Sequence, residues 1–373
     1  MAIPMAALHG STRAPNTRGP RSEMAGAPVL SVFFEGTANP LRPVTTQVGL
    51  FFSSTCALDV TAPEVELPPP QPEGAPPLEL KMGFDGCGVT NGMTGTLFAA
   101  GLAAQCDVVV KRARQILSAH GAPLPLVINV LGLSRGGIAA LLLAKALARL
   151  PRALAPRVEL SLCLFDPVPG NGITSARWLD VLGLSTARSV MDVSHCSIAR
   201  CLALYPHEPL PALAFHAPVL PRYPARCALV EDATLGCHQG ALYPVGTVKQ
   251  HAPELYPACA LAAARICRFF AECGTRLHFG RELAPLDDAA ALALCEREVR
   301  AAAAPTFRAA HSAGPAASIV RRAAAPLLNQ MHRTLLAAAD PADPRLRAEA
   351  GADGGLLLEV VHTGAQPQGG SGV

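Results

Sequence analysis

The sequence predicts an α/β fold in which helices cover both faces of a mostly parallel sheet. Continuous apolar segments at 124–131 and at Val158–Phe165 are typical of strands that are buried on both faces. Helical segments at 96–120 and 135–150 alternate with these strands along the chain. Because helix, strand, helix and strand follow one another, we expect the strands to run parallel.

The first core strand is expected at Val29–Phe34, a short apolar run that ends in the sequence Glu35-Gly36-Thr37. A proline-rich segment follows at 61–77. Proline lacks the N–H donor that a helix or a strand ladder needs, so we expect a linker or an exposed insertion there. A glycine-rich stretch at 83–95 then leads into the helix at 96–120.

The pattern is irregular between residues 174 and 224, with a candidate strand at 189–194. A later strand is expected at 225–230, and the small residues at 235–240 indicate a turn after it. Beyond Pro257 the sequence predicts helices at 258–273, 286–303 and 318–339, which could form a lid or a cap.

The composition excludes several classes of protein. Half of the 373 residues are hydrophobic, which is enough to bury a sizeable core. Lysine plus arginine number 31 and aspartate plus glutamate 28, so the formal net charge is only +3. That balance argues against the phosphate backbone of a nucleic acid as the main partner. The twelve cysteines include no C-x-x-C pair, so we expect no zinc ribbon. We also expect no metal site and no cofactor.

The sequence also bears on location. The apolar runs at 137–150 and 258–270 contain charged residues and are shorter than the roughly 20 residues that span a bilayer. Residues 1–28 lack the continuous apolar core of a secretory signal, so a cytoplasmic location with free thiols is the default expectation. Arg13, Arg18 and Arg21 against one acid, Glu23, are also typical of an organelle-targeting peptide, and non-classical export stays open.

The strongest chemical signal is the G-x-S-x-G pentapeptide from Gly132 to Gly136, which lies between a predicted strand and a predicted helix. This is the context of a nucleophile elbow, where a tight turn exposes the serine hydroxyl and crowding requires glycine two positions before and after it. Ser134 is therefore the candidate nucleophile. The positive end of the following helix points at the hydroxyl, and the backbone N–H of Arg135 is a candidate oxyanion donor.

A serine nucleophile needs a base, and the base needs a carboxylate to orient it. Asp166 directly follows the strand Val158–Phe165, where a parallel sheet presents its ligand-facing residues. An ordinary polar turn at the end of a strand would have the same sequence pattern. Among the downstream histidines His238 stands out, because it lies in the small-residue turn after a predicted strand. The adjacent Cys237 offers a thiol instead, although neighbouring side chains in an extended segment point in opposite directions.

These residues resemble a known group, the catalytic domain shared by phospholipase effectors of the type VI secretion system and a set of uncharacterised α/β-hydrolase-like proteins. The family's D-G-T-x-N resembles the sequence from Glu35 to Asn39, and its G-F-S-R-G-A resembles the elbow from Gly132 to Gly137. Its glycine-rich stretch resembles 83–95, and its D-T-V resembles Asp166-Pro167-Val168. The family's P-G-x-H-S-D-x-G resembles the sequence from Leu235 to Gly240.

The resemblance covers about 29–244 and implies an α/β-hydrolase-like fold. It implies that Ser134 is the nucleophile, Asp166 the orienting acid and His238 the general base, with the amides near Gly36 and Thr37 completing the oxyanion hole. A weaker match of the segment around His195 to the family makes this histidine the reserve base. The sequence departs from the family where Glu35 replaces aspartate, and where Gln239 and Gly240 replace the Ser-Asp pair after the histidine.

We therefore expect four regions. Residues 1–28 are a disordered tail or targeting segment, and 29–275 form an α/β-hydrolase-like catalytic domain that contains the proline-rich segment 61–77. Residues 276–342 form a helical region that could act as a lid or cap, and 343–373 form a mostly disordered tail.

The function expected from the sequence is a serine hydrolase that cleaves a carboxylic ester through an acyl-enzyme. The resemblance implies a lipid or other small-molecule ester as substrate, which would bring peripheral contact with a membrane. Two alternatives stay open: a catalytically inactive binding or interaction module on the same scaffold, and a hydrolase that uses Cys237. The acyl and headgroup specificity and the oligomeric state are not indicated by the sequence.

Overall fold

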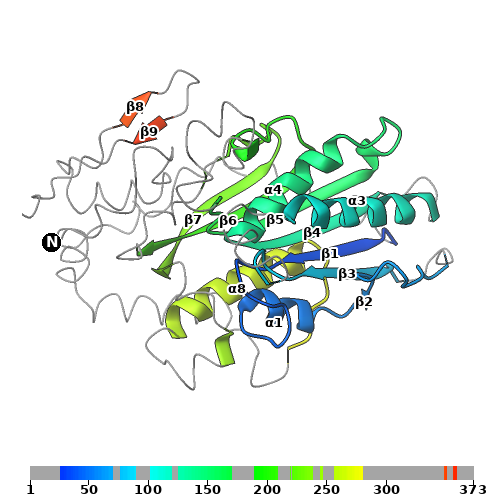
Figure 1. Ribbon diagram of the computed structural model, residues 1–373, viewed down its shortest axis with the longest axis horizontal. Helices are drawn as coiled ribbons and strands as arrows, with labels where there is room; N and C mark the ends of the chain where they lie inside the picture. The colour runs from blue at the N-terminus through cyan, green and yellow to red at the C-terminus, as the bar shows by residue number, and fades with distance from the viewer. Residues whose placement is uncertain are drawn as a thin grey trace, which may run out of the picture.

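A computed structural model of the chain has a seven-stranded sheet at its centre, in the order β2-β3-β1-β4-β5-β6-β7, with every neighbouring pair parallel (Figure 1). The predicted α/β fold with a parallel sheet is therefore confirmed. The strands are β1 (Val29–Phe34), β2 (Leu58–Asp59), β3 (Glu79–Phe84), β4 (Leu126–Leu133), β5 (Val158–Phe165), β6 (Ile198–Glu208) and β7 (Ala228–Cys237). The structure describes residues 26–69, 76–89, 101–119, 125–169, 189–208, 219, 221–237, 244–246, 256–279, 348–350 and 356–358.

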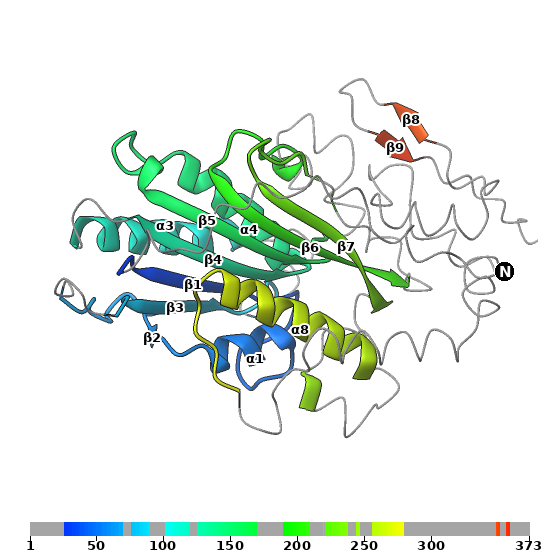
Figure 2. The ribbon, with the colours of Figure 1, turned by 180° about the vertical axis from the view of Figure 1, so that it is seen from behind.

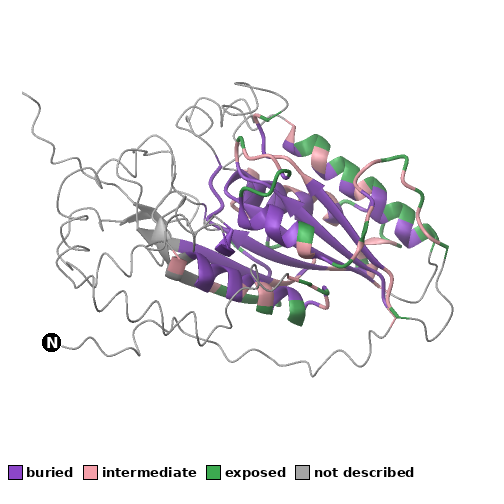
Figure 3. Ribbon diagram, turned by 90° about the horizontal axis from the view of Figure 1, so that it is seen from below, coloured by how far each residue is buried: buried purple, intermediate pink, exposed green. Residues whose placement is uncertain are grey.

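Helices cover both faces of the sheet. The helices α3 (Leu102–Ala119) and α4 (Arg135–Ala148) pack together on one face, and a short 3-10 helix, Ala155–Arg157, precedes β5. The helices α1 (Gln47–Ser54) and α8 (Tyr256–Glu272) lie on the other face, which Figure 2 shows from that side. The two main apolar clusters of the described residues lie one on each face, so the central strands are buried along their whole length (Figure 3).

The elements with continuous apolar sequence lie close to where they were predicted. The strands β1 and β5 have the predicted bounds, and β4 begins and ends two residues later than predicted. The helix α4 ends two residues early, and α8 begins two residues early and ends one early. Strand β7 begins at Ala228 and continues to Cys237, so 235–237 belong to a strand rather than to the predicted turn.

Other elements were not predicted, and one prediction was wrong. The prediction of a strand at 189–194 is wrong, since this segment is a helical turn and loop that lies before the true strand β6. The sequence pattern of β6 is interrupted by Arg200, whose guanidinium lies 3.7 Å from the carboxylate of Glu272 in α8. Helix α1 and strands β2 and β3 were also not predicted.

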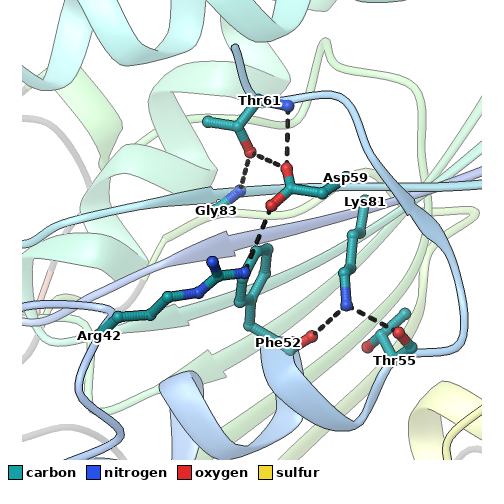
Figure 4. Close-up of polar contacts among 7 residues, drawn as sticks. All are labelled: Arg42, Phe52, Thr55, Asp59, Thr61, Lys81 and Gly83. Atoms are coloured by element: carbon teal, nitrogen blue, oxygen red, sulfur yellow. Dashed lines mark hydrogen bonds and ion pairs between the residues drawn. The ribbon is translucent and has the colours of Figure 1, made fainter. Parts of the chain in front are cut away.

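Strand β3 contains two charged residues that have partners on the α1 and α8 side of the sheet. The Glu79 carboxylate pairs with Arg276, which follows α8. The Lys81 ammonium donates to the carbonyls of Phe52 and Thr55 at 3.0 and 2.9 Å, which caps the carboxyl end of α1 (Figure 4). Burial lowers the pKa of Lys81 and raises that of Glu79. These partners explain why a charged segment forms a buried strand.

The proline-rich segment differs in part from the exposed insertion that was predicted. Residues 61–69 contain no helix or strand, as the prolines dictate. The buried Arg112 of α3 donates to the carbonyls of Ala62 and Val65 at 2.8 and 3.1 Å. Val65 and Leu67 pack against the apolar core, so this part of the segment lies on the domain.

The predicted helices at 286–303 and 318–339 and the segment 1–25 lie outside the described residues. Two short antiparallel strands, β8 (Ala348–Ala350) and β9 (Leu356–Leu358), fall within the range expected to be a mostly disordered tail. Among the helices in the described part of the chain, none has both the length and the apolar character needed to cross a bilayer.

Candidate active site

Ser134, Asp166 and the loop that starts at Glu35 lie at the carboxyl edge of the sheet. Strand β1 lies between β3 and β4, and the chain leaves it toward β2 and β3 on one side before it returns to β4 on the other. Parallel sheets bind ligands at such switch points, outside the carboxyl ends of the strands. The loop that starts at Glu35 follows β1, and Ser134 follows β4 directly.

Ser134 occupies a sharp bend between β4 and α4. Its backbone has φ 54° and ψ −116°, a conformation that L-residues rarely adopt. Its N–H donates to the carbonyl of Phe165 in β5 at 2.9 Å, and its carbonyl accepts from Gly137 and Val168 at 3.0 and 3.2 Å. This side chain is largely buried, and only 8% of the residue is exposed. The bend has the geometry that a nucleophile elbow requires.

The glycines on either side of Ser134 are required by close contacts between backbone segments. A Cβ on Gly132 would lie 2.3 Å from the carbonyl oxygen of Gly136. One on Gly136 would lie 2.1 Å from the carbonyl oxygen of Phe34, at the end of β1. Any side chain at either position would force the elbow away from the sheet, so the G-x-S-x-G pattern follows from packing.

Asp166 lies on the neighbouring strand end. Leu133 and Phe165 are register partners in β4 and β5, so Ser134 and Asp166 each follow one of a pair of facing residues. Asp166 is buried, its backbone has φ 43°, and its N–H donates to the carbonyl of Leu204 in β6 at 2.8 Å. The structure therefore brings these two predicted residues to adjacent positions on one edge.

The loop after β1 is fixed by two neighbouring segments, the loop after β3 and the elbow. The Ala38 N–H donates to the carbonyl of Cys87 at 3.0 Å, and a Cβ on Gly86 would lie 1.7 Å from the carbonyl oxygen of Gly36. From the elbow, the Arg135 guanidinium donates to the Thr37 hydroxyl at 2.7 Å. The loop that was predicted to supply oxyanion donors is thus held directly against the residue after Ser134.

Glu35 turns away from the elbow toward the amino end of α1. Its carboxylate accepts from the Thr46 hydroxyl at 2.5 Å and from the Gly36 N–H at 3.3 Å. Thr46 is the N-cap of α1, and its own hydroxyl accepts from Gly49. Burial raises the pKa of Glu35 to about 7. The Gly36 amide, which was predicted as an oxyanion donor, is therefore engaged by this carboxylate.

Only one of the two predicted histidines lies in the described part of the structure. His238 lies outside the described residues; in the chain it follows Cys237, the last residue of β7. His195 is exposed and precedes Ile198, the first residue of β6, which faces Leu160 near the start of β5. It therefore lies at the amino edge of the sheet, about 16 Å or more from the edge that carries Ser134. The structure does not bring His195 to the predicted site.

The sequence interpretation missed the side chains that link the loops of the site. It considered Arg135 only for its backbone N–H and Thr37 only for its amide, whereas their side chains bond to each other across 98 positions of the chain. The signal available in the sequence was the presence of a charged residue directly after the candidate nucleophile.

Comparison with known proteins finds several similar solved structures. No family model matches the chain, and no curated protein matches it. One similar solved structure is the Tle1 effector bound to the VgrG spike from the type 6 secretion system, with 16% identity, a TM-score of 0.35, 60% of this chain covered and 52% of that chain. Another is an uncharacterised protein from Pseudomonas aeruginosa, with 14% identity, a TM-score of 0.43, 86% of this chain covered and 60% of that one. This chain spans about half the length of the first and less than two thirds of the second.

Proposed function

We propose that this chain is a serine hydrolase that cleaves carboxylic esters through an acyl-enzyme, with Ser134 as the nucleophile. The observation that carries the proposal is the strained bend at Ser134, with φ 54° between β4 and α4 and a glycine packed against backbone on each side. Strain of this kind persists where the surrounding structure enforces it, and it is common at active sites. A structural turn between a strand and a helix would not need it.

In the proposed reaction Ser134 attacks the ester carbonyl and His238 accepts the proton from the hydroxyl. Asp166 orients the imidazole and stabilises the imidazolium that forms. The amides of Arg135 and Thr37 would donate to the oxyanion of the tetrahedral intermediate. What supports His238 over His195 is its place in the chain, directly after β7, whereas His195 lies at the other edge of the sheet.

The proposed substrate class is a lipid ester, with peripheral contact at a membrane surface. This part rests on the resemblance of the sequence motifs to phospholipase effectors, because a fold alone hosts many chemistries. A panel of nitrophenyl esters and phospholipids of different acyl length and headgroup would define the substrate.

The experiment that tests the proposal is labelling of the full chain with a fluorophosphonate probe, which reacts with activated serines. We expect the unaltered chain to be labelled and the Ser134→Ala variant to be unlabelled. Ser118→Ala is the matched control, because this serine is exposed on α3, on the surface of the same domain.

Three results would contradict the proposal. Equal labelling of Ser134→Ala and the unaltered chain would exclude Ser134 as the nucleophile. Loss of ester hydrolysis in Cys237→Ser but not in Ser134→Ala would favour the thiol. A folded chain that neither reacts with the probe nor hydrolyses any ester would favour a binding module.

A further inference from the structure

Arg135 carries a buried positive charge directly after the candidate nucleophile. The residue is only 5% exposed and is the first residue of α4. Its guanidinium donates to the Thr37 hydroxyl at 2.7 Å, and the side chain of Cys87 lies beside it. A hydroxyl and a thiol are neutral or weak acceptors, so neither balances a full positive charge in the way that a carboxylate does.

The guanidinium lacks a counter-charge within the part of the chain that the structure describes. No carboxylate there forms an ion pair with Arg135, and its buried Nε atom has no hydrogen-bond acceptor. Desolvation by burial lowers the pKa of Arg135. A buried charge without a partner is strongly unfavourable, and arginine stays protonated rather than escaping the penalty by losing its proton.

The position in the helix makes the same charge still less favourable. The amino end of a helix carries the positive end of the macrodipole and disfavours cations, which are stabilised at the carboxyl end instead. Lys145 and Arg149 at the carboxyl end of α4 follow that rule. Arg135 does not, and yet it is buried beside Ser134. An anion bound here would meet a guanidinium, a helix amino end and a hydroxyl, which together make a suitable site.

We propose that Arg135 and Thr37, at the amino end of α4, form a binding subsite for an oxyanion of the phosphate or carboxylate class, next to Ser134. Access is through the loop after β1, because Thr37 is half-buried and the following Ala38 is exposed. The Arg135 guanidinium is held by the hydroxyl of Thr37, a residue that is only half-buried.

The role of this subsite in substrate recognition rests on the proposed function. If Ser134 attacks an ester, then a negatively charged group on the same substrate would be held by Arg135 and Thr37. The chain would prefer esters that carry an anionic group, and the preference would be expressed in KM because the group is bound equally in the ground state and in the transition state.

The first test uses inorganic phosphate alone and needs no catalysis. We measure thermal unfolding of the full chain in increasing sodium phosphate against sodium chloride of equal ionic strength. Phosphate should raise the unfolding temperature beyond the chloride effect, because a ligand that binds only the folded state stabilises it. Arg135→Gln should raise the phosphate concentration that gives half of the maximal stabilisation, the phosphate midpoint, by about tenfold or more, since the charge-assisted bonds are lost. Arg149→Gln removes an exposed charge from the same helix and should leave the midpoint unchanged.

Thr37→Val provides a second variant that keeps the charge and removes the hydroxyl. It should weaken the phosphate response less than Arg135→Gln does, and it keeps the test open if Arg135→Gln fails to fold. Hydrolysis then distinguishes a phosphate-bearing from a carboxylate-bearing substrate. We compare neutral nitrophenyl esters with matched esters that carry a phosphate or a carboxylate, and Arg135→Gln should raise KM by a larger factor for the charged ester than for the neutral one.

The subsite is overturned if phosphate acts no differently from chloride on the unaltered chain. It is also overturned if Arg135→Gln lowers the unfolding temperature equally at every phosphate concentration, which is the result of a purely structural role. These failures are separable from failure of the proposed function. Phosphate binding without fluorophosphonate labelling would support the subsite and contradict the proposed hydrolase. Labelling without phosphate binding would support the hydrolase and contradict the subsite.

Discussion

Ser134 and Phe165 are joined by a backbone hydrogen bond of 2.9 Å, which ties the elbow to the end of β5. Asp166 is the next residue after Phe165, and its own N–H bonds to β6. The two candidate catalytic residues therefore sit on neighbouring strand ends whose relative position is set by the sheet. A catalytic pair built on rigid elements in this way is positioned more accurately than one carried on loops.

Replacing Asp166 by asparagine should remove most of the ester hydrolysis and leave the fold intact. Asparagine tolerates the positive φ of 43° at this position better than most residues do, so the backbone is preserved. In a serine triad the amide holds the histidine in the wrong tautomer, and the expected loss in kcat is about 10⁴-fold. Steady-state kinetics with a nitrophenyl ester measures it. Unchanged kcat in a variant with unchanged urea unfolding would remove Asp166 from the reaction.

The two candidate histidines should respond differently to alanine. His238→Ala should lose about as much activity as Ser134→Ala, because residues of a triad act as a unit. His195→Ala should retain activity, since this exposed residue precedes β6 at the amino edge of the sheet. Rates of ester hydrolysis for the two variants under identical conditions decide between them. Activity lost in His195→Ala and kept in His238→Ala would reverse the assignment.

A methyl group at Gly136 should destabilise the whole domain. The added Cβ would lie 2.1 Å from the carbonyl oxygen of Phe34, and backbone at that distance cannot move without separating α4 from β1. We expect the free energy of unfolding of Gly136→Ala to fall by about 3 kcal/mol, as in other overpacked sites. Urea unfolding followed by circular dichroism measures the change.

Gly36→Ala is the comparison for this prediction, because its Cβ would meet the side chain of Leu133 at 3.0 Å rather than backbone. A flexible side chain can shift, so the stability loss should be clearly smaller. If Gly136→Ala is as stable as Gly36→Ala, the close approach of α4 to β1 does not exist in solution.

How far the sequence predicts the structure depends on whether the signal is local. The strands β1, β4 and β5 consist almost entirely of apolar residues because both of their faces are covered, and that pattern is visible in the sequence. The elbow is also visible in the sequence, because the crowding around Ser134 requires glycines only two positions away. Both are consequences of short stretches of chain.

Strand β3 was missed because its charged residues are made compatible with burial by distant partners. Glu79 pairs with Arg276, which lies 197 positions later, and Lys81 caps a helix that was itself not predicted. The contact of Arg135 with Thr37 was missed in the same way. No local pattern records a hydrogen bond between two loops that meet only after the sheet has formed.

The role of Lys81 as the cap of α1 predicts a loss of stability in Lys81→Met. Methionine preserves most of the apolar stem but leaves the carbonyls of Phe52 and Thr55 without the ammonium donor. Unsatisfied buried acceptors are costly, so the free energy of unfolding should fall by about 2 kcal/mol. Lys111→Met, on the exposed face of α3, is the control and should change stability by less than about 0.5 kcal/mol. Equal stability of the two variants would show that the cap contributes nothing.

The buried carboxyl of Glu35 predicts a specific pH dependence of stability. Burial raises its pKa from 4.5 to about 7, so between these values the folded chain binds more protons than the unfolded chain. The contribution of Glu35 to the free energy of unfolding is therefore largest at low pH and falls as the pH rises toward 7. Linkage sets the total change at no more than about 3 kcal/mol.

Glu35→Gln isolates the contribution of this carboxyl, because glutamine keeps an oxygen that can accept from Thr46 and does not titrate. Urea unfolding of both chains across about pH 5 to 8 should show that the variant loses less stability than the unaltered chain as the pH rises. Glu64→Gln, an exposed carboxyl in the proline-rich segment, should follow the unaltered chain. If the free energy of unfolding of Glu35→Gln changes with pH in parallel with that of the unaltered chain, then this carboxyl is already ionised in the folded chain at low pH. The loop after β1, where Glu35 accepts from the Gly36 N–H, would then be held without a protonated residue.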